Sequence, residues 1–353
     1  MFRKLIILAL CEVVLAQESK PLARDGKFLY EDYAGCASCH GTDGKGEVEG
    51  VALDPPAPDL TDCSFNSREP RRDWRAVINH GGQARGLSMS MPSYSEALTS
   101  EQVEALIDYL KTFCAETGWP PGELNFRRAH LTTKAFPENE VLLIPHYVQG
   151  SNQSVTTKFV YERRIGKHGQ WEIAAPFIAQ WQSPSATGIG DIELSAKYVL
   201  AHNDQARAIV SSGLEVVSPT GKTALGGSGW KLAPFIAAGK GYDHFTLQSS
   251  VKLEQPLEHD NGESELLFNF AFTLPLTPDK KGFFPMLETQ SVSNLETGAT
   301  QWFLAPQLYI GLVRRGHIAL SFGGQIPLTV ERPFDYRLMS FFLWEYADGG
   351  LWW

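Results

Sequence analysis

The residues with the clearest chemistry in this chain form one pentapeptide, Cys36-Ala37-Ser38-Cys39-His40. Two thiols two residues apart, followed at once by an imidazole, are the attachment pattern of a c-type haem. Each sulfur forms a thioether with one side group of the porphyrin, and this tether places the next imidazole beneath the iron. Gly41 then leaves the backbone room to turn away. The spacing predicts one covalently attached haem c, held by Cys36, Cys39 and His40, with His40 as an iron ligand.

Two other kinds of site use the same pair of thiols. A Cys-Xaa-Xaa-Cys pair can act as a redox dithiol, which is expected after a strand, or as half of a zinc site, which needs a second ligand pair at similar spacing. Neither signal is visible in the sequence, and neither is the second Cys-Xaa-Xaa-Cys-His motif that would favour a peroxidase. The immediate histidine therefore favours the haem.

The first residues predict export from the cytoplasm. A basic pair precedes the apolar run from Leu5 to Leu15, and Val14-Leu15-Ala16 precedes Gln17, so residues 1–16 form a predicted signal peptide that is cleaved after Ala16. The run is too short for a membrane-spanning helix. Cys11 raises the alternative of a lipoprotein anchor, although Leu10 stands where a small residue is needed. Export agrees with haem c attachment and permits disulfides.

The composition divides the 353 residues into two units. Residues 17–118 have helical periodicity, and residues 136–353 alternate apolar and polar side chains in short segments. Residues 119–135, which contain Trp119-Pro120-Pro121-Gly122, form a predicted linker. The net charge of −9 and the pI near 5.5 give no reason to expect nucleic acid as a partner.

Three segments of the first unit have the spacing of helices: residues 25–33, 73–79 and 100–113. Thr99 and Gln102 form a capping box that opens the last of them. The stripe of this helix that we expect to be buried is Val103, Leu106, Ile107 and Leu110.

Other residues of this unit have expected roles around the haem. A carbonyl held by Pro56 or Pro58 could accept a hydrogen bond from the second ring nitrogen of His40. After the signal and the haem cysteines are accounted for, Cys63 and Cys114 remain. They could form a disulfide between the haem loop and the last helix, or stay as two buried free thiols.

This order of elements resembles the class I cytochromes c, an all-α family. The resemblance rests on Gly26-Lys27-Phe28-Leu29-Tyr30 before C-A-S-C-H-G, on Ala57-Pro58-Asp59-Leu60, and on Met91-Pro92 before the capped final helix. In that family a methionine shortly before the last helix is the second axial ligand, which implies Met91 as the partner of His40. Met89 nearly matches, and His80 is an alternative ligand. A methionine here could also be a core thioether that fills a gap.

Ligation by histidine and methionine has a functional consequence. Such an iron has no open coordination position, so oxygen or peroxide binds only by displacing Met91, and the thioether raises the reduction potential. We therefore expect an electron carrier rather than a catalyst of bond chemistry.

The second unit alternates with the period of β-strands. From 190 to 200 apolar residues such as Ile192, Leu194 and Tyr198 alternate with the polar residues Asp191, Glu193, Ser195 and Lys197. About twelve strands are expected, starting near residues 140, 154, 169, 189, 206, 229, 243, 263, 282, 300, 316 and 334. This pattern predicts an all-β antiparallel up-and-down barrel. Alternation alone leaves open whether the apolar face lies inside, as in a soluble barrel, or outside, as in a membrane barrel.

Aromatic spacing and loop lengths favour the membrane barrel. Trp171 and Trp181 lie ten residues apart on one strand face, which spans about 25 Å, the height of an outer-membrane apolar band. Tyr336 and Tyr346 repeat the spacing.

Loop lengths agree with this choice. Tight connections, at 166–169, 201–205, 239–243, 278–281 and 314–316, alternate with longer ones such as 218–229 and 291–300. Tight turns belong on the periplasmic side, so the haem unit is expected there. The basic residues of these turns, which we expect to form a solvated rim, are Lys167, Lys280, Lys281, Arg314 and Arg315.

Residues 188–198 and 214–221 are similar to outer-membrane barrels of the MetA-pathway phenol-degradation or transporter family, which implies an architecture more than an activity. A haem unit before a barrel is also similar in plan to the fused cytochrome-porins that oxidise ferrous iron at the cell surface. The resemblance implies contact with outer-membrane lipid and an exported chain with its haem domain in the periplasm.

Three functions are consistent with these patterns. The first is a monohaem cytochrome c of the outer membrane that exchanges electrons with a periplasmic carrier and with another donor or acceptor, such as external ferrous iron. The second is a transport or binding barrel for small apolar solutes with an accessory redox-sensing haem domain. The third is a soluble periplasmic β domain. The sequence indicates neither the direction of electron flow nor the oligomeric state.

Overall fold

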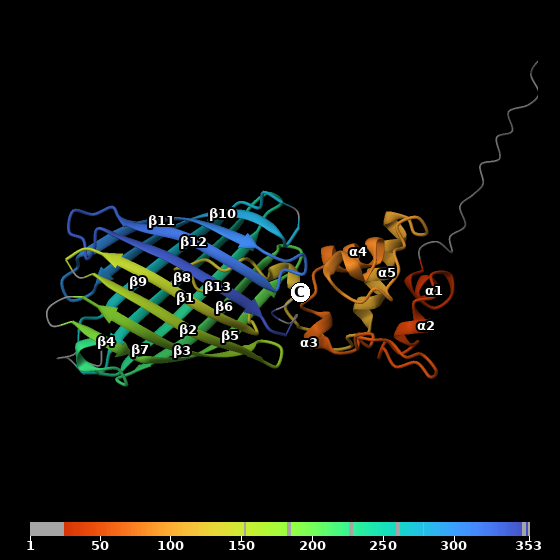
Figure 1. The fold of residues 1–353 in the computed structure, drawn as a ribbon, viewed down its shortest axis with the longest axis horizontal. Coiled ribbons are helices and arrows are strands. Elements are labelled where there is room, and N and C mark those ends of the chain that lie inside the picture. Colours follow the sequence, from red (N-terminus) through yellow and green to blue (C-terminus); the bar gives the residue numbers. More distant parts are fainter. Residues whose placement is uncertain are drawn as a thin grey trace, which may run out of the picture.

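The computed structural model describes residues 25–151, 153–181, 185–225, 229–258, 262–277, 279–347 and 351. A small helical domain stands at one end of a long β-barrel (Figure 1). The predicted signal peptide, residues 1–16, and Cys11 lie outside the described residues. None of the described helices combines the length and the apolar character needed to cross a membrane.

The helical domain contains α1 (Gly26–Phe28), the π-turn η2 (Leu29–Tyr33), α2 (Ala37–His40), α3 (Cys63–Asn66), α4 (Arg71–His80), η3 (Gly82–Arg85) and α5 (Ser100–Thr112). The predicted capping box is present: the Thr99 side chain accepts from the Gln102 backbone, and the Gln102 side chain accepts from the Thr99 backbone. The four residues of the predicted stripe are buried. They pack on Leu29, Tyr30, Leu60 and Ile78, which form the core of this domain.

Cys63 and Cys114 form a disulfide, with their Cα atoms 4.9 Å apart. Of the two alternatives that the sequence left open, the structure therefore has the disulfide. It joins α3 to the chain that leaves α5.

Thirteen strands form the barrel: β1 (Glu140–Gln149), β2 (Ser154–Ile165), β3 (Gly169–Gln180), β4 (Ala186–Ile189), β5 (Ile192–Asn203), β6 (Ala208–Ser218), β7 (Lys231–Gly241), β8 (Thr246–Pro256), β9 (Glu265–Thr273), β10 (Gly282–Asn294), β11 (Thr300–Gly311), β12 (Ile318–Pro327) and β13 (Tyr336–Glu345), with the short turn η5 (Thr223–Leu225) before β7. Every pairing is antiparallel, and the β2–β3 pair closes the ring. β4 and β5 pair with successive parts of β3 and together fill one position. The ring therefore has twelve positions, as predicted.

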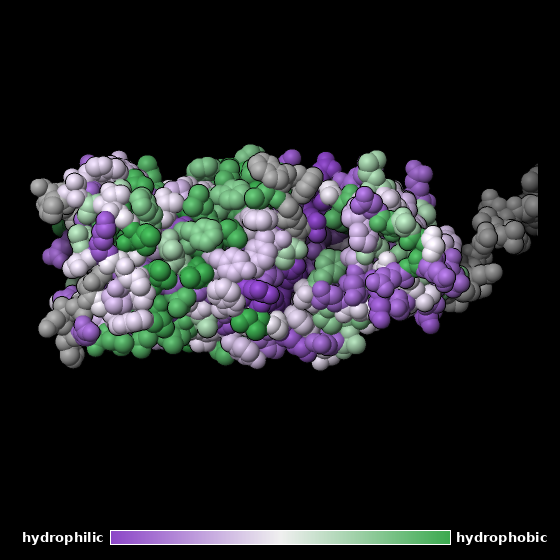
Figure 2. Space-filling view, turned by 60° about the horizontal axis from the view of Figure 1, so that its bottom comes forward, coloured by the Kyte–Doolittle hydropathy of each residue, from purple (hydrophilic) through white to green (hydrophobic). Residues whose placement is uncertain are grey.

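The barrel exposes many apolar side chains, while its buried interior holds polar and charged side chains together with an apolar cluster that includes Leu142, Phe284 and Phe341. On β5, Lys197 and Val199 are buried inside, whereas Leu194, Tyr198 and Leu200 point outward and are more than half exposed. The same outward apolar surface continues around the ring through Phe159, Phe177, Ile236, Phe268, Phe283 and Phe322. Figure 2 shows green patches of hydrophobic residues over the barrel wall on the face in view, while the helical domain is mostly hydrophilic. This arrangement is that of a membrane barrel.

Aromatic side chains stand near both ends of the wall. Trp181 and Tyr336, at the end away from the helical domain, are exposed. At the opposite end, Tyr161 contacts both Trp171 and Tyr346, with ring centroids 5.4 and 5.5 Å apart. Aromatic belts at two levels are typical of outer-membrane barrels.

The chain between the helical domain and β1, which includes the predicted linker, runs inside the barrel after the turn η4 (Gly122–Leu124). We name residues 122–139 the lumen segment. Its apolar side chains, Leu124, Phe126, Ala135 and Phe136, are buried against inward-facing residues of β5, β6 and β7.

Polar contacts fix the deepest part of the lumen segment. Glu288, fully buried on β10, accepts hydrogen bonds from the backbone of His130, Leu131 and Thr132 at 2.7 to 3.1 Å. Lys197 donates to the carbonyls of Lys134 and Phe136, at 2.7 and 3.0 Å. Because Glu288 stands in the middle of its strand, the lumen segment reaches about the middle of the barrel.

Candidate functional site

The predicted attachment residues occupy one short helix. Cys36 precedes α2, Cys39 and His40 end it, and the His40 backbone N–H donates to the Cys36 carbonyl at 3.0 Å. Gly41 ends the helix with φ of +74°, a conformation that favours glycine, so the expected turn is present. The buried Tyr30 hydroxyl donates to the Gly41 carbonyl at 2.7 Å and holds the end of α2 on the domain core.

His40 has the properties of a metal ligand. Its Nδ1 atom is buried and has no hydrogen-bond partner among the described residues. Burial also lowers the pKa of the ring below its ordinary value. The imidazole is therefore neutral at physiological pH, which is the form that binds a metal ion.

The predicted hydrogen bond from His40 to a carbonyl at Pro56 or Pro58 is not present. The proline-rich loop instead packs on the turn after His40, where the Gly46 backbone N–H donates to the His40 carbonyl at 2.9 Å. Ala57 lies so close that its carbonyl would be 2.4 Å from a Cβ atom on Gly46. The loop therefore contacts backbone rather than the imidazole.

The two thiols do not have the features of the alternative sites. Burial raises the pKa of the Cys36 thiol to about 11, so it is not a reactive thiolate at neutral pH. Within the part of the chain that the structure describes, neither thiol belongs to a group of three metal-ligating side chains. A structural zinc needs four such ligands. Both observations agree with cysteines that form thioether bonds to a haem.

Residues 81–94, which we name the Met91 loop, connect α4 to the segment before α5. Met91 is half-buried, and its carbonyl accepts from the Gly82 backbone N–H at 3.1 Å. Met89 is 78% exposed, and His80 is an exposed residue at the end of α4. Among the three candidates for the second iron ligand, Met91 is therefore the one that the fold holds against the domain.

Tyr94 brings the Met91 loop to the attachment residues. Its hydroxyl donates to the Ala34 carbonyl at 3.1 Å and hydrogen-bonds the Cys36 thiol. Its backbone N–H donates to the Ile78 carbonyl at 3.0 Å, at the end of α4. Tyr94 also shares an apolar cluster with Cys36 and Trp74. Half-buried aromatic side chains beside the thiols are suitable surroundings for a porphyrin.

The helical domain is fixed to the barrel through turns that the sequence predicted to be tight. In the β9–β10 turn, Asp279 binds Arg85 at 2.8 Å and Lys280 binds Asp73 at 2.7 Å. In the β2–β3 turn, Lys167 lies 3.3 Å from Glu116. The prediction that Lys167 and Lys280 form only a solvated rim is therefore wrong, because both pair with carboxylates of the helical domain.

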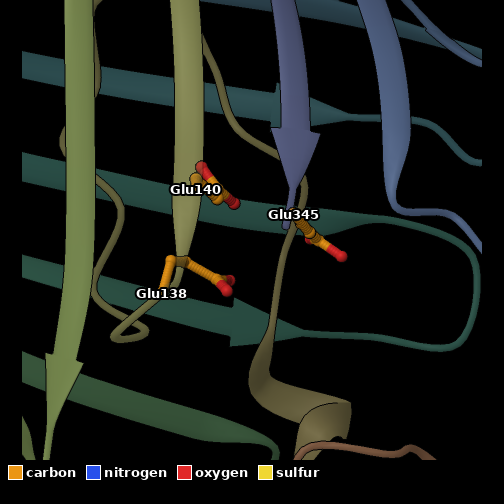
Figure 3. A group of neighbouring side chains, drawn as sticks. All are labelled: Glu138, Glu140 and Glu345. Carbon is orange, nitrogen blue, oxygen red and sulfur yellow. The ribbon is translucent and has the colours of Figure 1, made fainter. Parts of the chain in front are cut away.

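A second group of charged residues lies inside the barrel. Glu138, Glu140 and Glu345 have carboxylate oxygens within 4.8 Å of one another (Figure 3). The Lys134 ammonium lies 2.6 Å from Glu138 and 3.0 Å from Glu140, and Arg128 binds Glu140 at 2.9 Å. Cations of the lumen segment thus pair with Glu138 and Glu140.

Sequence reasoning missed the lumen segment and the contact between Arg85 and Asp279. One signal was present for the first: five charged residues occur in a stretch that lacks the regular alternation of a strand, namely Arg127, Arg128, Lys134, Glu138 and Glu140. The second has no local signal, because its partners are 194 residues apart.

Residues 23–113 match the family model described as Cytochrome c. No curated protein matches the chain. Among solved structures, the barrel is similar to an outer membrane channel from Pseudomonas putida F1, with 11% identity and a TM-score of 0.51 over 62% of this chain and 99% of that one. The KdgM and NanC porins share 9% and 10% identity, with TM-scores of 0.40 and 0.42, over 58% of this chain and 98% of each. The chain thus joins a cytochrome c domain, which implies a covalently bound c-type haem, to a twelve-position closed barrel.

Proposed function

We propose that this protein is a monohaem electron carrier of the outer membrane, in which the barrel anchors a cytochrome c domain on the periplasmic side. One observation carries the proposal: a single chain combines the attachment helix α2 with a barrel that turns its apolar residues outward. The proposal includes export of the chain and ligation of the haem iron by His40 and Met91.

The outward surface supports the membrane location. Leucine and phenylalanine side chains that are about half exposed surround the barrel, and an apolar surface of this extent is unfavourable in water. In a lipid bilayer the same surface is stable, and among the described strands the ring is closed, with only the short β4 paired on one side. A soluble periplasmic β domain would need the opposite arrangement.

The residues of the helical domain support electron transfer without bond chemistry. Cys36 and Cys39 supply the thioethers, and His40 and Met91 supply the axial ligands. A c-type haem held in this way supplies a one-electron couple with no open coordination position. Burial keeps His40 neutral, and Tyr94 keeps the Met91 loop beside the attachment turn.

The placement of α2 favours a partner in the periplasm. In Figure 1, α1 and α2 lie at the end of the helical domain that is remote from the barrel, whereas α3 lies next to it. The lumen segment also fills the part of the barrel nearest the domain. Electron exchange with a soluble carrier on the domain side is therefore better supported than exchange through the barrel with an external donor such as ferrous iron. The same segment counts against free passage of a solute.

The test uses the full chain, made in a host that matures c-type cytochromes. We expect haem staining in the outer-membrane fraction, and reduction in liposomes by an impermeant reductant only from the side that carries the helical domain. A colourless product would exclude the electron-carrier function. Extraction in plain buffer would exclude the membrane anchor, and reduction from the opposite side would favour the route through the barrel.

A further inference from the structure

The Met91 loop contacts both the barrel and the haem-attachment turn. Near its start, Arg85 in η3 reaches the barrel turn at Asp279. At its end, Tyr94 reaches Ala34, two residues before Cys36. The residue that we assign as the second axial ligand thus lies between a contact with the membrane anchor and a contact with the haem site.

The contact on the barrel side is a chain of ion pairs through Asp279, Arg85, Asp73 and Lys280, and Arg72 lies 4.0 Å from Asp73. Arg85 lies 2.8 Å from Asp279 and 3.2 Å from Asp73, and Lys280 lies 2.7 Å from the other oxygen of Asp73. The side chains of Arg85 and Asp73 are only 9% and 6% exposed. Charges removed from water to this extent depend on their partners, so loss of one leaves another unpaired in a poorly solvated place.

Backbone packing connects Arg85 to Met91. The turn that carries Arg85 begins at Gly82, whose N–H donates to the Met91 carbonyl at 3.1 Å and whose carbonyl accepts from Leu87 at 2.8 Å. A Cβ atom on Gly82 would lie 2.1 Å from the Ser88 carbonyl and 3.2 Å from the Met91 Cβ atom. Because Gly82 and Met91 are packed this closely, movement of the turn that carries Arg85 would be transmitted to Met91.

We propose that the barrel positions the axial methionine: Asp279 and Lys280, acting on Arg85 and Asp73, hold the Met91 loop in the conformation that presents Met91 to the iron. This inference rests on the proposed function, because it takes Met91 as the ligand. Asp279 and Arg85 are positioning residues. The ligation of the haem then depends on the docking of the domain onto its membrane anchor.

The test compares full-length, haem-loaded variants in detergent. In Asp279→Asn and Arg85→Gln, we expect cyanide to displace Met91 about tenfold faster than in the parent protein, because each loses a charged hydrogen bond. The charge-transfer band of methionine-ligated ferric haem should weaken, and the reduction potential should fall. The conservative variant Asp279→Glu keeps the charge, so its charge-transfer band and reduction potential should be close to those of the parent protein.

The matched control is Lys167→Gln. It removes another ion pair between the barrel and the domain, 3.3 Å from Glu116, which lies outside the Met91 loop. We expect less than a twofold change in cyanide binding. Lys280→Gln, which removes one outer charge of the network, provides a milder variant if the first two do not fold.

Two results would overturn the inference: an unchanged rate in Asp279→Asn, Arg85→Gln and Lys280→Gln, or an equal acceleration in Lys167→Gln. Failure of the ligand assignment looks different. In that case the parent protein lacks the methionine band, and Met91→Ala leaves its spectrum unchanged.

Discussion

The helical domain buries its large apolar side chains in a core, whereas the barrel carries many of them on its outer surface. In the domain, Leu29, Tyr30 and Ile107 are at most 1% exposed and form the core. In the barrel, Leu194 and Phe322 are more than half exposed, and the buried positions include Glu288, Glu140 and Lys197. The hydrophobic effect is the same in both, but one region folds against water and the other against lipid.

Away from the interface that they share, the two regions also differ in how they neutralise charge. In the domain, Arg71 and Arg75 bind Glu104 at the surface, where all three side chains are between 36% and 48% exposed. In the barrel, Arg128 binds two carboxylates that are at most 1% exposed. Surface pairs contribute little to stability, whereas a broken buried pair leaves an uncompensated charge. The predictions below test both differences.

The largest effect is expected from the double substitution of Cys36 and Cys39 by alanine. Covalent haem should be lost completely, because both thioethers disappear, and haem staining after denaturing electrophoresis measures this. The barrel should still enter the outer membrane, since its core does not include these residues. Loss of membrane insertion together with the haem would show that the two regions do not fold independently.

The next effect concerns the buried charges. Arg128→Met should destabilise the barrel by about 3–5 kcal/mol, because Glu140 and Glu162 lose their shared partner. Urea unfolding in detergent measures the change. The matched control is Arg75→Met in the helical domain, where about 0–1 kcal/mol is expected for an exposed pair. Equal losses of stability in Arg128→Met and Arg75→Met would mean that the buried and the exposed ion pairs do not differ in their contribution.

A charge on the outer wall gives a smaller effect. Ile236 lies at the middle of β7 and is 54% exposed, so Ile236→Arg should cost about 2–4 kcal/mol if lipid covers it. Tyr33, which is 57% exposed on the helical domain, is the control, and Tyr33→Arg should change stability by less than about 0.5 kcal/mol. A neutral result at Ile236 would mean that water, not lipid, contacts this face.

The smallest effect is a pH dependence confined to the helical domain. Burial lowers the pKa of Lys111 to about 8, while the unfolded chain has the ordinary value of 10.5. Between these values the unfolded state binds more protons, so domain stability should rise with pH, by at most about 1.4 kcal/mol per pH unit. Denaturant titrations of the haem-loaded protein at pH 8 and 10, followed by the haem absorbance of the helical domain, measure the slope. The slope of stability against pH should be smaller in Lys111→Met. An identical slope in this variant would mean that other groups cause the pH dependence.

Much of the fold was predictable because its signals are local. The alternation of side chains placed the strand starts within a few residues, and the pair Thr99 and Gln102 defined the start of α5. The attachment helix follows from five consecutive residues. The period of two is the same for an apolar interior and an apolar exterior, so that choice rested on aromatic spacing and loop lengths, and the exposed apolar wall agrees with it.

What the sequence did not predict depends on residues far apart along the chain. The lumen segment has no period of its own, and its shape comes from Glu288 and Lys197 on distant strands. The bond expected between His40 and the proline-rich loop is replaced by backbone contacts at Gly46. The charged turn at Asp279 and Lys280 acquires its role only when the domain docks on it.

The path of the lumen segment has a topological consequence. The segment starts at Gly122, whose N–H bonds to Ser67 of the helical domain, and it leads into β1, which begins at the same rim, where β13 ends. It enters and leaves the cylinder on one side, as a loop and not as a thread. Residues 122–139 can therefore be withdrawn without separating any pair of strands, provided that the domain covering the rim lifts away first.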